Sequence, residues 1–299
     1  MYKSIRIIRI IVALAAMIAP TIALVAGWNS LFGRMQITMA IITGAAFWLL
    51  VWLVATLIYG RIYCSTVCPL GTLQDCFATA WRMSPLGKRD RRLGYRFHPP
   101  LNRLRLMVLL LVLACLIAGW LMIPMLLDPY GAYARIVRQF ITAPLTGTGP
   151  AVPFSLATFS VAATTLLVTL AFSLRRGRLL CNTICPVGSL LGLLASRSYF
   201  HPDINTDKCI GCGECSKVCK SECINLSDHT VDPSRCVVCF KCMSVCPNDA
   251  ITYRSGRHRL GMPLMQPTAA AHMQADVASQ PPFNSNDNET IPPTTGRHS

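Results

Sequence analysis

The chain has 299 residues, of which 53% are hydrophobic and only 14% are charged. A single soluble globular domain carries more charge than this, so the composition predicts a membrane protein. The net charge of +15 is compatible with nucleic-acid binding, but the basic residues cluster beside long apolar runs, where lysine and arginine determine membrane topology. We therefore expect no nucleic-acid partner. The fifteen cysteines indicate metal or redox ligation.

Four apolar runs predict transmembrane helices, at about 10–26, 37–59, 104–127 and 152–174. The first follows three basic residues, as a signal peptide does, but it is longer than the usual apolar region, which favours a retained helix. Lysine and arginine are concentrated between the second and third runs and directly after the fourth. This asymmetry predicts a multi-pass protein of the bacterial cytoplasmic (inner) membrane with both termini in the cytoplasm.

A short motif occurs twice, each time directly after an even-numbered apolar run. Its copies read Gly60-Arg61-Ile-Tyr-Cys64-Ser-Thr-Val-Cys68-Pro69-Leu-Gly71 and Gly177-Arg178-Leu-Leu-Cys181-Asn-Thr-Ile-Cys185-Pro186-Val-Gly188. These two Cys-Pro motifs predict a duplicated two-helix unit. The four motif cysteines, Cys64, Cys68, Cys181 and Cys185, are candidates for a redox or metal site across a pseudo-symmetry axis. The alternative is that they are small packing residues. A third cluster, another metal or no cofactor all stay open.

Two tandem C-x-x-C-x-x-C-x-x-x-C runs follow between residues 209 and 246. This spacing is typical of bacterial ferredoxins with two [4Fe-4S] clusters, in which the fourth cysteine of each run ligates the other cluster. The first cluster is therefore assigned to Cys209, Cys212, Cys215 and Cys246, and the second to Cys236, Cys239, Cys242 and Cys219. Zinc ribbons use separated C-x-x-C pairs, and a disulfide framework requires an oxidising compartment. We expect the remaining cysteines to be buried thiols, namely Cys76, Cys115 and Cys223.

These observations predict three regions. Residues 1–200 form a four-helix transmembrane domain, residues 201–254 an α+β two-cluster ferredoxin domain in the cytoplasm, and residues 255–299 a disordered tail. The basic stretch from Lys88 to Arg105 is expected mainly to set topology and contact anionic lipid, and docking of an acidic partner is the alternative.

Four apolar runs, two Cys-Pro motifs and a C-terminal two-cluster segment together resemble the NapH-type membrane ferredoxins. The broader group includes the MauN, NosR and CcoG-like iron–sulfur membrane proteins. The resemblance covers about Ile5 to Tyr253. It implies the membrane component of a quinol dehydrogenase, an electron-transfer subunit rather than a complete enzyme, which exchanges electrons with the quinone pool and a redox protein partner. The CcoG-like members imply an alternative, a maturation factor that reduces a metal or thiol.

A third possibility is a membrane anchor for a soluble redox protein. None of the six histidines lies inside a predicted span, so a haem held by paired helix histidines is not expected. Because quinol oxidation releases protons, a carboxylate is expected near the quinone site. Asp128 and Asp75 are the candidates, and each can instead be a capping or loop residue.

Overall fold

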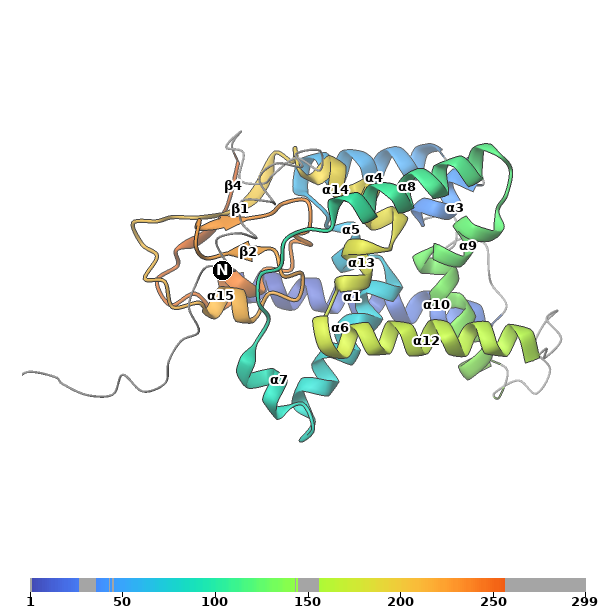
Figure 1. The fold of residues 1–299 in the computed structure, drawn as a ribbon, viewed down its shortest axis with the longest axis horizontal. Coiled ribbons are helices and arrows are strands. Elements are labelled where there is room, and N and C mark those ends of the chain that lie inside the picture. Colours follow the sequence, from blue (N-terminus) through green and yellow to red (C-terminus); the bar gives the residue numbers. More distant parts are fainter. Residues whose placement is uncertain are drawn as a thin grey trace, which may run out of the picture. The chain divides into compact units, whose positions relative to one another are not determined.

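The computed structural model describes residues 2–26, 36–42, 44, 46–142, 144 and 156–255, whose fold is shown in Figure 1. Residues Met1–Met265 form one compact unit. A second unit, Gln266–Ser299, lies outside the described residues, and so does nearly all of the tail that was predicted to be disordered. The described part is largely helical and carries two small antiparallel sheets.

The helices occupy most of the first two hundred residues. They are α1 (Tyr2–Val25), α3 (Ile37–Ile42), α4 (Ala46–Tyr59), α5 (Tyr63–Thr66), α6 (Pro69–Met83), α7 (Lys88–Leu93), α8 (Asn102–Ile117), α9 (Met122–Leu127), α10 (Pro129–Val137), the π-helix η1 (Arg138–Thr142), α12 (Leu156–Arg176), α13 (Leu179–Thr183) and α14 (Pro186–Ala195). The C-terminal part adds β1 (Phe200–Ile204), α15 (Glu214–Lys217), β2 (Ile224–Asn225), β3 (Thr230–Val231), α16 (Lys241–Val245) and β4 (Ile251–Ser255).

The two copies of the repeat have the same local structure and pack crosswise. Each copy is a long apolar helix, a short helix carrying the first motif cysteine, and a helix that begins at the motif proline. α6 of the first copy packs on α12 of the second, while α14 of the second copy packs on α4 of the first. Figure 1 shows these two pairs on either side of the short helices α5 and α13. This crosswise packing brings both Cys-Pro motifs into one region.

Two of the four long apolar runs form shorter helices than the sequence predicts. The run 104–127 divides into α8 and α9, and Gly119 between them has a φ of +77°. The run 37–59 likewise divides into α3 and α4 near Gly44, whose φ is +68°. The prediction of one continuous helix over each run is therefore wrong. Two described helices, α1 and α12, are long and apolar enough to cross a membrane, and α4 is apolar but shorter.

The C-terminal segment has its own core and is tied to the helical part by aromatic side chains. β1 pairs antiparallel with β4, and β2 with β3. Buried Ile224, Met243 and Ile251 form a core with the cysteines of the tandem runs. The ring of Phe200 stacks between Tyr59 at the end of α4 and Tyr253 on β4, with centroid distances of 5.8 and 5.7 Å. The Tyr253 hydroxyl also donates to the Tyr59 carbonyl.

Candidate iron–sulfur and motif cysteine sites

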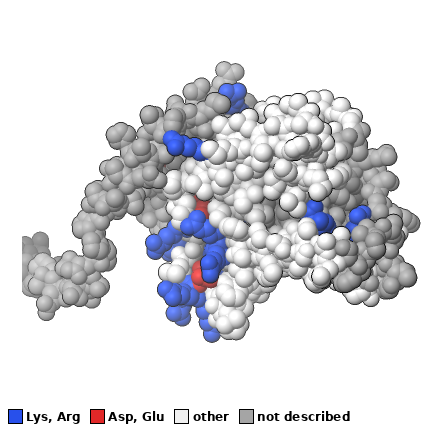
Figure 2. All heavy atoms as spheres, turned by 45° about the vertical axis from the view of Figure 1, so that its right-hand side comes forward, with Lys and Arg blue, Asp and Glu red and all other residues white. Residues whose placement is uncertain are grey.

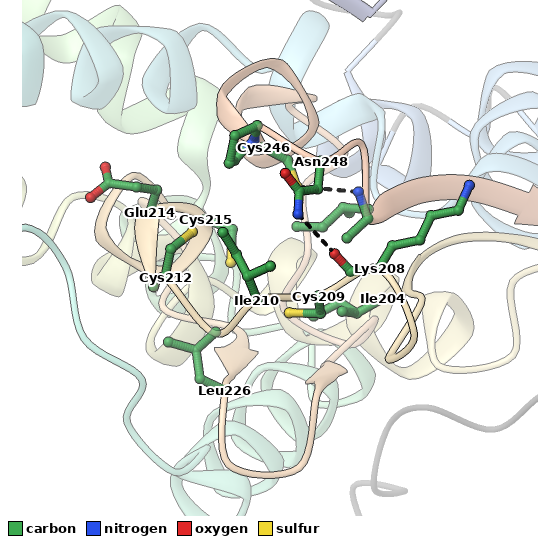
Figure 3. Close-up of a pocket in the computed structure, with 14 residues that line it drawn as sticks. Ile204, Lys208, Cys209, Ile210, Cys212, Glu214, Cys215, Leu226, Cys246 and Asn248 are labelled. Atoms are coloured by element: carbon green, nitrogen blue, oxygen red, sulfur yellow. Dashed lines mark hydrogen bonds between the residues drawn. The ribbon is translucent and has the colours of Figure 1, made fainter. Parts of the chain in front are cut away.

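The first of two cysteine-lined cavities in the C-terminal segment is shown in Figure 3. Its cysteines come from the first tandem run and from the end of the second, and they are Cys209, Cys212, Cys215 and Cys246. Cys212 is exposed, whereas Cys215 is buried. The Asn248 side chain donates to the Lys208 carbonyl and so ties the two contributing stretches together. The first cavity thus unites the four residues that the spacing assigns to one cluster.

The second cavity lies deeper in the protein. Its cysteines are Cys219, Cys223, Cys236, Cys239 and Cys242. Four of these are the residues assigned to the second cluster. The fifth, Cys223, is 1% exposed, and its sulfur lies 3.4 Å from that of Cys219. Cys223 is therefore buried as expected, but it lies among the candidate ligands rather than in a separate packing position.

The two cavities have loops of the same unusual backbone conformation. Gly211 and Gly213 have φ values of +68° and +74° in the first loop. Val238 and Phe240 occupy the corresponding places in the second and have φ values of +50° and +58°. Left-handed backbone costs a residue with a side chain roughly 1–2 kcal/mol. A loop that accepts this cost twice is shaped for the ligand set rather than for its own stability.

The donor sets fit the cofactors that the sequence implies. A [4Fe-4S] cluster takes four thiolates, one to each iron, and each cavity offers at least four cysteine sulfurs in a largely apolar lining. No group of three or more His, Cys, Asp or Glu side chains in the described part of the chain is placed to hold a single metal ion. The assignment of individual cysteines to the two clusters stays a prediction.

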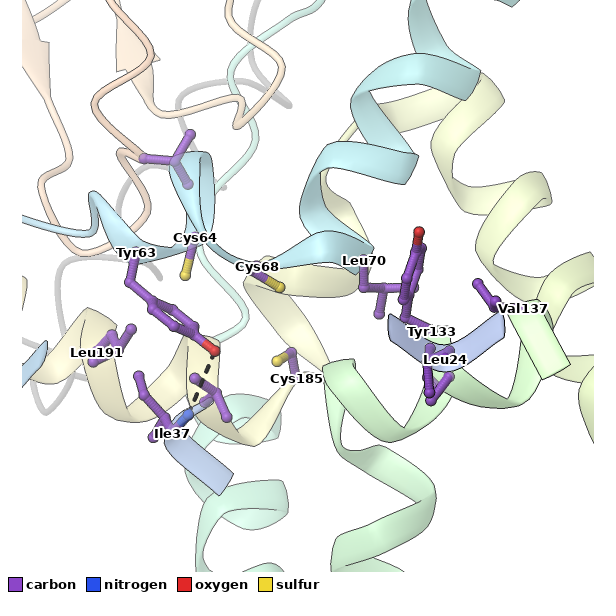
Figure 4. Close-up of a cluster of buried hydrophobic side chains, with 14 residues drawn as sticks. Leu24, Ile37, Tyr63, Cys64, Cys68, Leu70, Tyr133, Val137, Cys185 and Leu191 are labelled. Carbon is purple, nitrogen blue, oxygen red and sulfur yellow. Dashed lines mark hydrogen bonds between the residues drawn. The ribbon is translucent and has the colours of Figure 1, made fainter. Parts of the chain in front are cut away.

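The motif cysteines form a further buried group, shown in part in Figure 4. Cys64, Cys68 and Cys185 belong to one apolar cluster with Tyr63 and Leu191. Cys181 is equally buried, and its sulfur donates to Gln74 Oε1 at 3.3 Å. Cys68 and Cys185 occupy equivalent positions before the prolines that begin α6 and α14, with φ values of −68° in both copies. The crosswise packing therefore brings the two motifs together.

Each motif is held by the arginine of the other. Arg178 Nη1 donates to the Cys64 carbonyl at 2.7 Å, and Arg61 Nη2 donates to the Cys181 carbonyl at 3.4 Å. The motif glycines make room for this, because a Cβ at Gly71 would lie 2.6 Å from the Cys64 carbonyl oxygen. A Cβ at Gly188 would collide with the Cys181 carbonyl oxygen in the same way. The duplicated Arg and Gly thus serve one reciprocal arrangement.

The two buried arginines differ in their charge partners. Arg178 is paired with Asp75, with Nε–Oδ1 and Nη2–Oδ2 distances of 3.0 and 2.8 Å. Arg61 is completely buried, and its hydrogen bonds run to Asn182 and to backbone oxygens, with Cys64 Sγ at 3.8 Å from Nη2. No ion pair in the described part of the chain involves Arg61. Within the described residues the Arg61 charge is therefore met by neutral hydrogen-bond acceptors rather than by a carboxylate.

Burial disfavours the thiolate form of three motif cysteines, Cys68, Cys181 and Cys185. It raises the pKa of Cys181 to about 11 and raises the pKa of Cys68 and Cys185 well above the usual value. Protonated thiols are poor nucleophiles and poor metal ligands at neutral pH. A metal that displaces the protons provides the positive charge that the thiolates need.

The two carboxylates considered for quinol oxidation are both engaged in the structure. Asp128 caps α10, where its Oδ2 accepts a hydrogen bond from the Gly131 amide at 2.6 Å. Burial acts to raise the pKa of Asp75, but Arg178 and Lys220 outweigh it and hold that pKa below its ordinary value. The stability provided by this ion pair is therefore present above pH 4, roughly, and is lost only as the pH falls through the lowered pKa.

The other cysteine predictions have mixed outcomes. Cys115 is buried, as predicted. Cys76 is only half-buried, so the prediction of a fully buried thiol is wrong there. It lies on α6 and directly follows Asp75 in the sequence.

Comparison with known proteins supports iron–sulfur binding by this chain. A family described as "4Fe-4S dicluster domain" matches residues 208–250, which hold the tandem runs. A family described as "4Fe-4S binding domain" matches residues 41–93 and 158–201, which contain both Cys-Pro motifs. No solved structure matches the chain significantly.

Two curated proteins are similar over about two thirds of the chain. YccM of Escherichia coli (strain K12), named as a candidate electron transport protein, is 27% identical over 65% of this chain and 53% of its own length. The methylamine utilization ferredoxin-type protein MauN of Paracoccus denitrificans (strain Pd 1222) is 28% identical over 64% of this chain and 58% of its own. The chain therefore spans little more than half the length of these relatives. It contains 4Fe-4S ferredoxin-type domains and is similar to ferredoxin-type proteins of electron transport.

Proposed function

We propose that this protein is a membrane-bound iron–sulfur relay that passes electrons between the quinol pool and a redox protein partner. The observation that carries the proposal is the serial placement of the cysteine sites. The motif cysteines lie in the core of the helical part, and Cys239 of the second cavity packs against their cluster. The first cavity includes the exposed Cys212, and none of its cysteines belongs to that cluster. When bound, [4Fe-4S] clusters supply one-electron transfer.

The surface of the helical part supports the membrane assignment. α1 and α12 have hydropathies of 2.4 and 1.8, yet only 22% and 17% of their most apolar windows are buried inside the protein. Large apolar side chains on α4 and α8 are also exposed, for example Leu50 at 62% and Met107 at 66%. Figure 2 shows a broad surface without charge, beside a zone where lysines and arginines gather. An apolar surface of this extent supports contact with lipid.

The chain's own residues define what each end of the relay does. Quinol gives up two electrons and two protons, whereas the cysteine sites accept electrons singly. The exposed Cys212 places the first site within reach of a docked partner. Cys239 is half-buried and packs against the cluster that contains the motif cysteines, which brings the second site close to them. We propose that the ferredoxin segment and both termini face the cytoplasm, as the basic residues indicate.

Iron and acid-labile sulfide analysis tests the proposal, combined with EPR of the anaerobic, detergent-purified protein before and after addition of a menaquinol analogue. About eight iron atoms per chain correspond to the two ferredoxin clusters, and about twelve to a third cluster at the motif cysteines. Cluster signals that change when quinol is added are the expected result. Intact clusters that ignore quinol at every potential would overturn the quinol-linked function.

A second candidate, a maturation factor that reduces a metal or a thiol, is favoured by one feature. Arg61 is a buried cation without a carboxylate partner, and it lies beside Cys64, where a bound metal would leave thiolate charge. Replacing Cys64 and Cys181 by Ser separates the possibilities. Loss of turnover with intact ferredoxin clusters assigns chemistry to the motif cysteines, and unchanged turnover assigns the protein to the anchor class.

A further inference from the structure

A cavity of about 170 Å³ lies where three distant stretches of the chain meet. We call it the seam cavity. Residues 98–101, which lead into α8, form one wall. The end of α12 and the helix α13 form a second wall, through Arg176, Leu179, Asn182 and Thr183, and residues 220–222 together with Arg235 close it. The cavity therefore lies between the helical part and the ferredoxin segment.

The seam cavity is bordered by both kinds of cysteine site. Asn182 directly follows the motif cysteine Cys181, and Lys220 directly follows Cys219 of the second cavity. Two hydrogen bonds join these walls. The Arg178 amide donates to the Lys220 carbonyl at 3.1 Å, and Asn182 Nδ2 donates to the Ser221 carbonyl at 3.2 Å. A ligand in this cavity would lie next to the residues that follow both sites.

One end of the seam cavity is polar and combines donors with acceptors. His98 Nδ1 lies 3.0 Å from Glu222 Oε2, and Arg176 Nη2 lies 3.2 Å from His98 Nε2. An arginine can only donate, so Nε2 accepts and Nδ1 carries the proton that faces Glu222. The Glu222 side chain is only 8% exposed, and its backbone φ is +51°. A buried carboxylate on strained backbone is a frequent feature of functional sites.

Two donors at the same end lack partners. Ser221 Oγ and Arg235 Nη2 are shut off from solvent and make no hydrogen bond within the described residues. Unpaired buried donors of this kind are rare and costly. The Ser221 hydroxyl can turn toward a ligand by rotation about one bond. The lining also has an apolar part, formed by Pro99, Pro100, Leu101 and Leu179.

We propose that the seam cavity binds the head group of a quinone or quinol, an inference that rests on the proposed function. A flat ring would lie against the prolines and leucines, with its oxygen atoms among Ser221, Glu222 and His98. A quinol hydroxyl can donate to the carboxylate, and a quinone carbonyl can accept from the serine. Leu101 is 55% exposed at the beginning of α8, where an apolar tail can leave toward lipid.

The charge of the lining favours a neutral ring over an anion. Arg176, Lys220 and Arg235 alone would suit a phosphate, but Lys220 is paired with Asp75 and Arg235 with Asp232. The buried carboxylate of Glu222 in the wall repels a second anion. A molecule with both hydroxyl donors and carbonyl acceptors satisfies this mixed lining better.

Photoaffinity labelling tests the site on the full chain in lipid nanodiscs. The probe is an azido-naphthoquinone with a short isoprenoid tail, and mass spectrometry locates its attachment. We expect attachment within residues 98–101, 179–183 or 220–222. Glu222→Gln removes the charged acceptor and Leu101→Trp narrows the entrance, so each should reduce labelling about tenfold. Asp203→Asn is the control, because Asp203 lies outside the lining of the seam cavity and forms its ion pair with the exposed Arg254. Its labelling should not change.

The iron content of each variant reports whether the chain has folded. Labelling at other residues, or labelling that neither Glu222→Gln nor Leu101→Trp reduces, would overturn the site. Displacement of the probe by acidic lipid but not by unlabelled quinone would overturn it in favour of an anion site. EPR on the same samples keeps the two proposals apart. Quinol-dependent cluster reduction with labelling elsewhere refutes the site alone, and labelling in the cavity without reduction supports the site but refutes the quinol-linked function.

Discussion

The guanidinium of Arg178 donates to the carbonyl oxygen of Cys64 at 2.7 Å, although the two residues are 114 positions apart. Arg61 makes the matching contact with the Cys181 carbonyl in the other direction. Each arginine therefore fixes the backbone that carries the first cysteine of the opposite motif. Four sulfurs from two chain segments can form one site only if both backbones are held in this way.

The glycine that follows each Cys-Pro pair is expected to be essential for this arrangement. In Gly71→Ala the new Cβ would lie 2.6 Å from the Cys64 carbonyl oxygen and 3.7 Å from Arg178 Nη1. Relief of this overlap has to move the backbone of α5 or of α6, at a cost of about 1–3 kcal/mol. We expect a lower Tm together with faster maleimide labelling of Cys64.

The control for this experiment is Gly119→Ala. This variant makes the same substitution at a glycine where nothing lies within 4 Å of the position that a Cβ would take. Its φ of +77° makes the substitution strained, so its Tm should fall as well. Cys64 labelling should nevertheless stay at the wild-type rate. Equal Cys64 labelling in the two variants would show that Gly71 does not hold the motif.

Asp75→Asn should destabilise the protein strongly, because it leaves the buried guanidinium of Arg178 without its carboxylate. Loss of one partner of a buried ion pair typically costs about 3–5 kcal/mol. Thermal unfolding in detergent should show a large drop in Tm. Asp203→Asn removes the 3.6 Å pair with Arg254, which is 61% exposed, and should cost at most about 1 kcal/mol. Similar Tm values for the two variants would contradict this account of Asp75.

Cysteine spacing anticipated eight of the nine cysteines that line the two ferredoxin cavities, because ligand spacing is a local property of the chain, and it did not anticipate Cys223 there. The left-handed Val238 and Phe240 could have been anticipated only by aligning the two runs, which places them at Gly211 and Gly213. Valine and phenylalanine by themselves favour backbone with a negative φ. The tertiary requirement of the loop outweighs local preference at these two positions.

Other features depend on contacts that a linear pattern does not contain. The duplicated arginines are visible in the sequence, but which motif each one contacts follows from the crosswise packing of α6 on α12 and α14 on α4. The buried helix α10 was missed in a predicted outer loop. Asp128 followed by Pro129 is a helix-start signal that could have revealed it. His98 and Glu222 form a pair, but no motif in the sequence indicates that these two residues lie close together.

Cys223 should be able to replace a lost ligand in the second cavity. Its sulfur lies 3.4 Å from that of Cys219, and both residues line the same cavity. Cys219→Ser should therefore keep part of the iron of the second cluster, while the double variant Cys219→Ser/Cys223→Ser should lose about four iron atoms per chain. Cys246→Ser should lose about four iron atoms on its own, because the described lining of the first cavity contains no additional cysteine that could replace it.

Iron and acid-labile sulfide per chain measure all three variants, and Cys223→Ser alone is the control, with a full iron content expected. If Cys219→Ser loses about four iron atoms by itself, Cys223 is a packing residue that cannot reach the cluster. If Cys223→Ser alone loses them, Cys223 rather than Cys219 is the native ligand. Either result would change the assignment of the fourth cysteine, which at present follows from the spacing and from the lining of the second cavity.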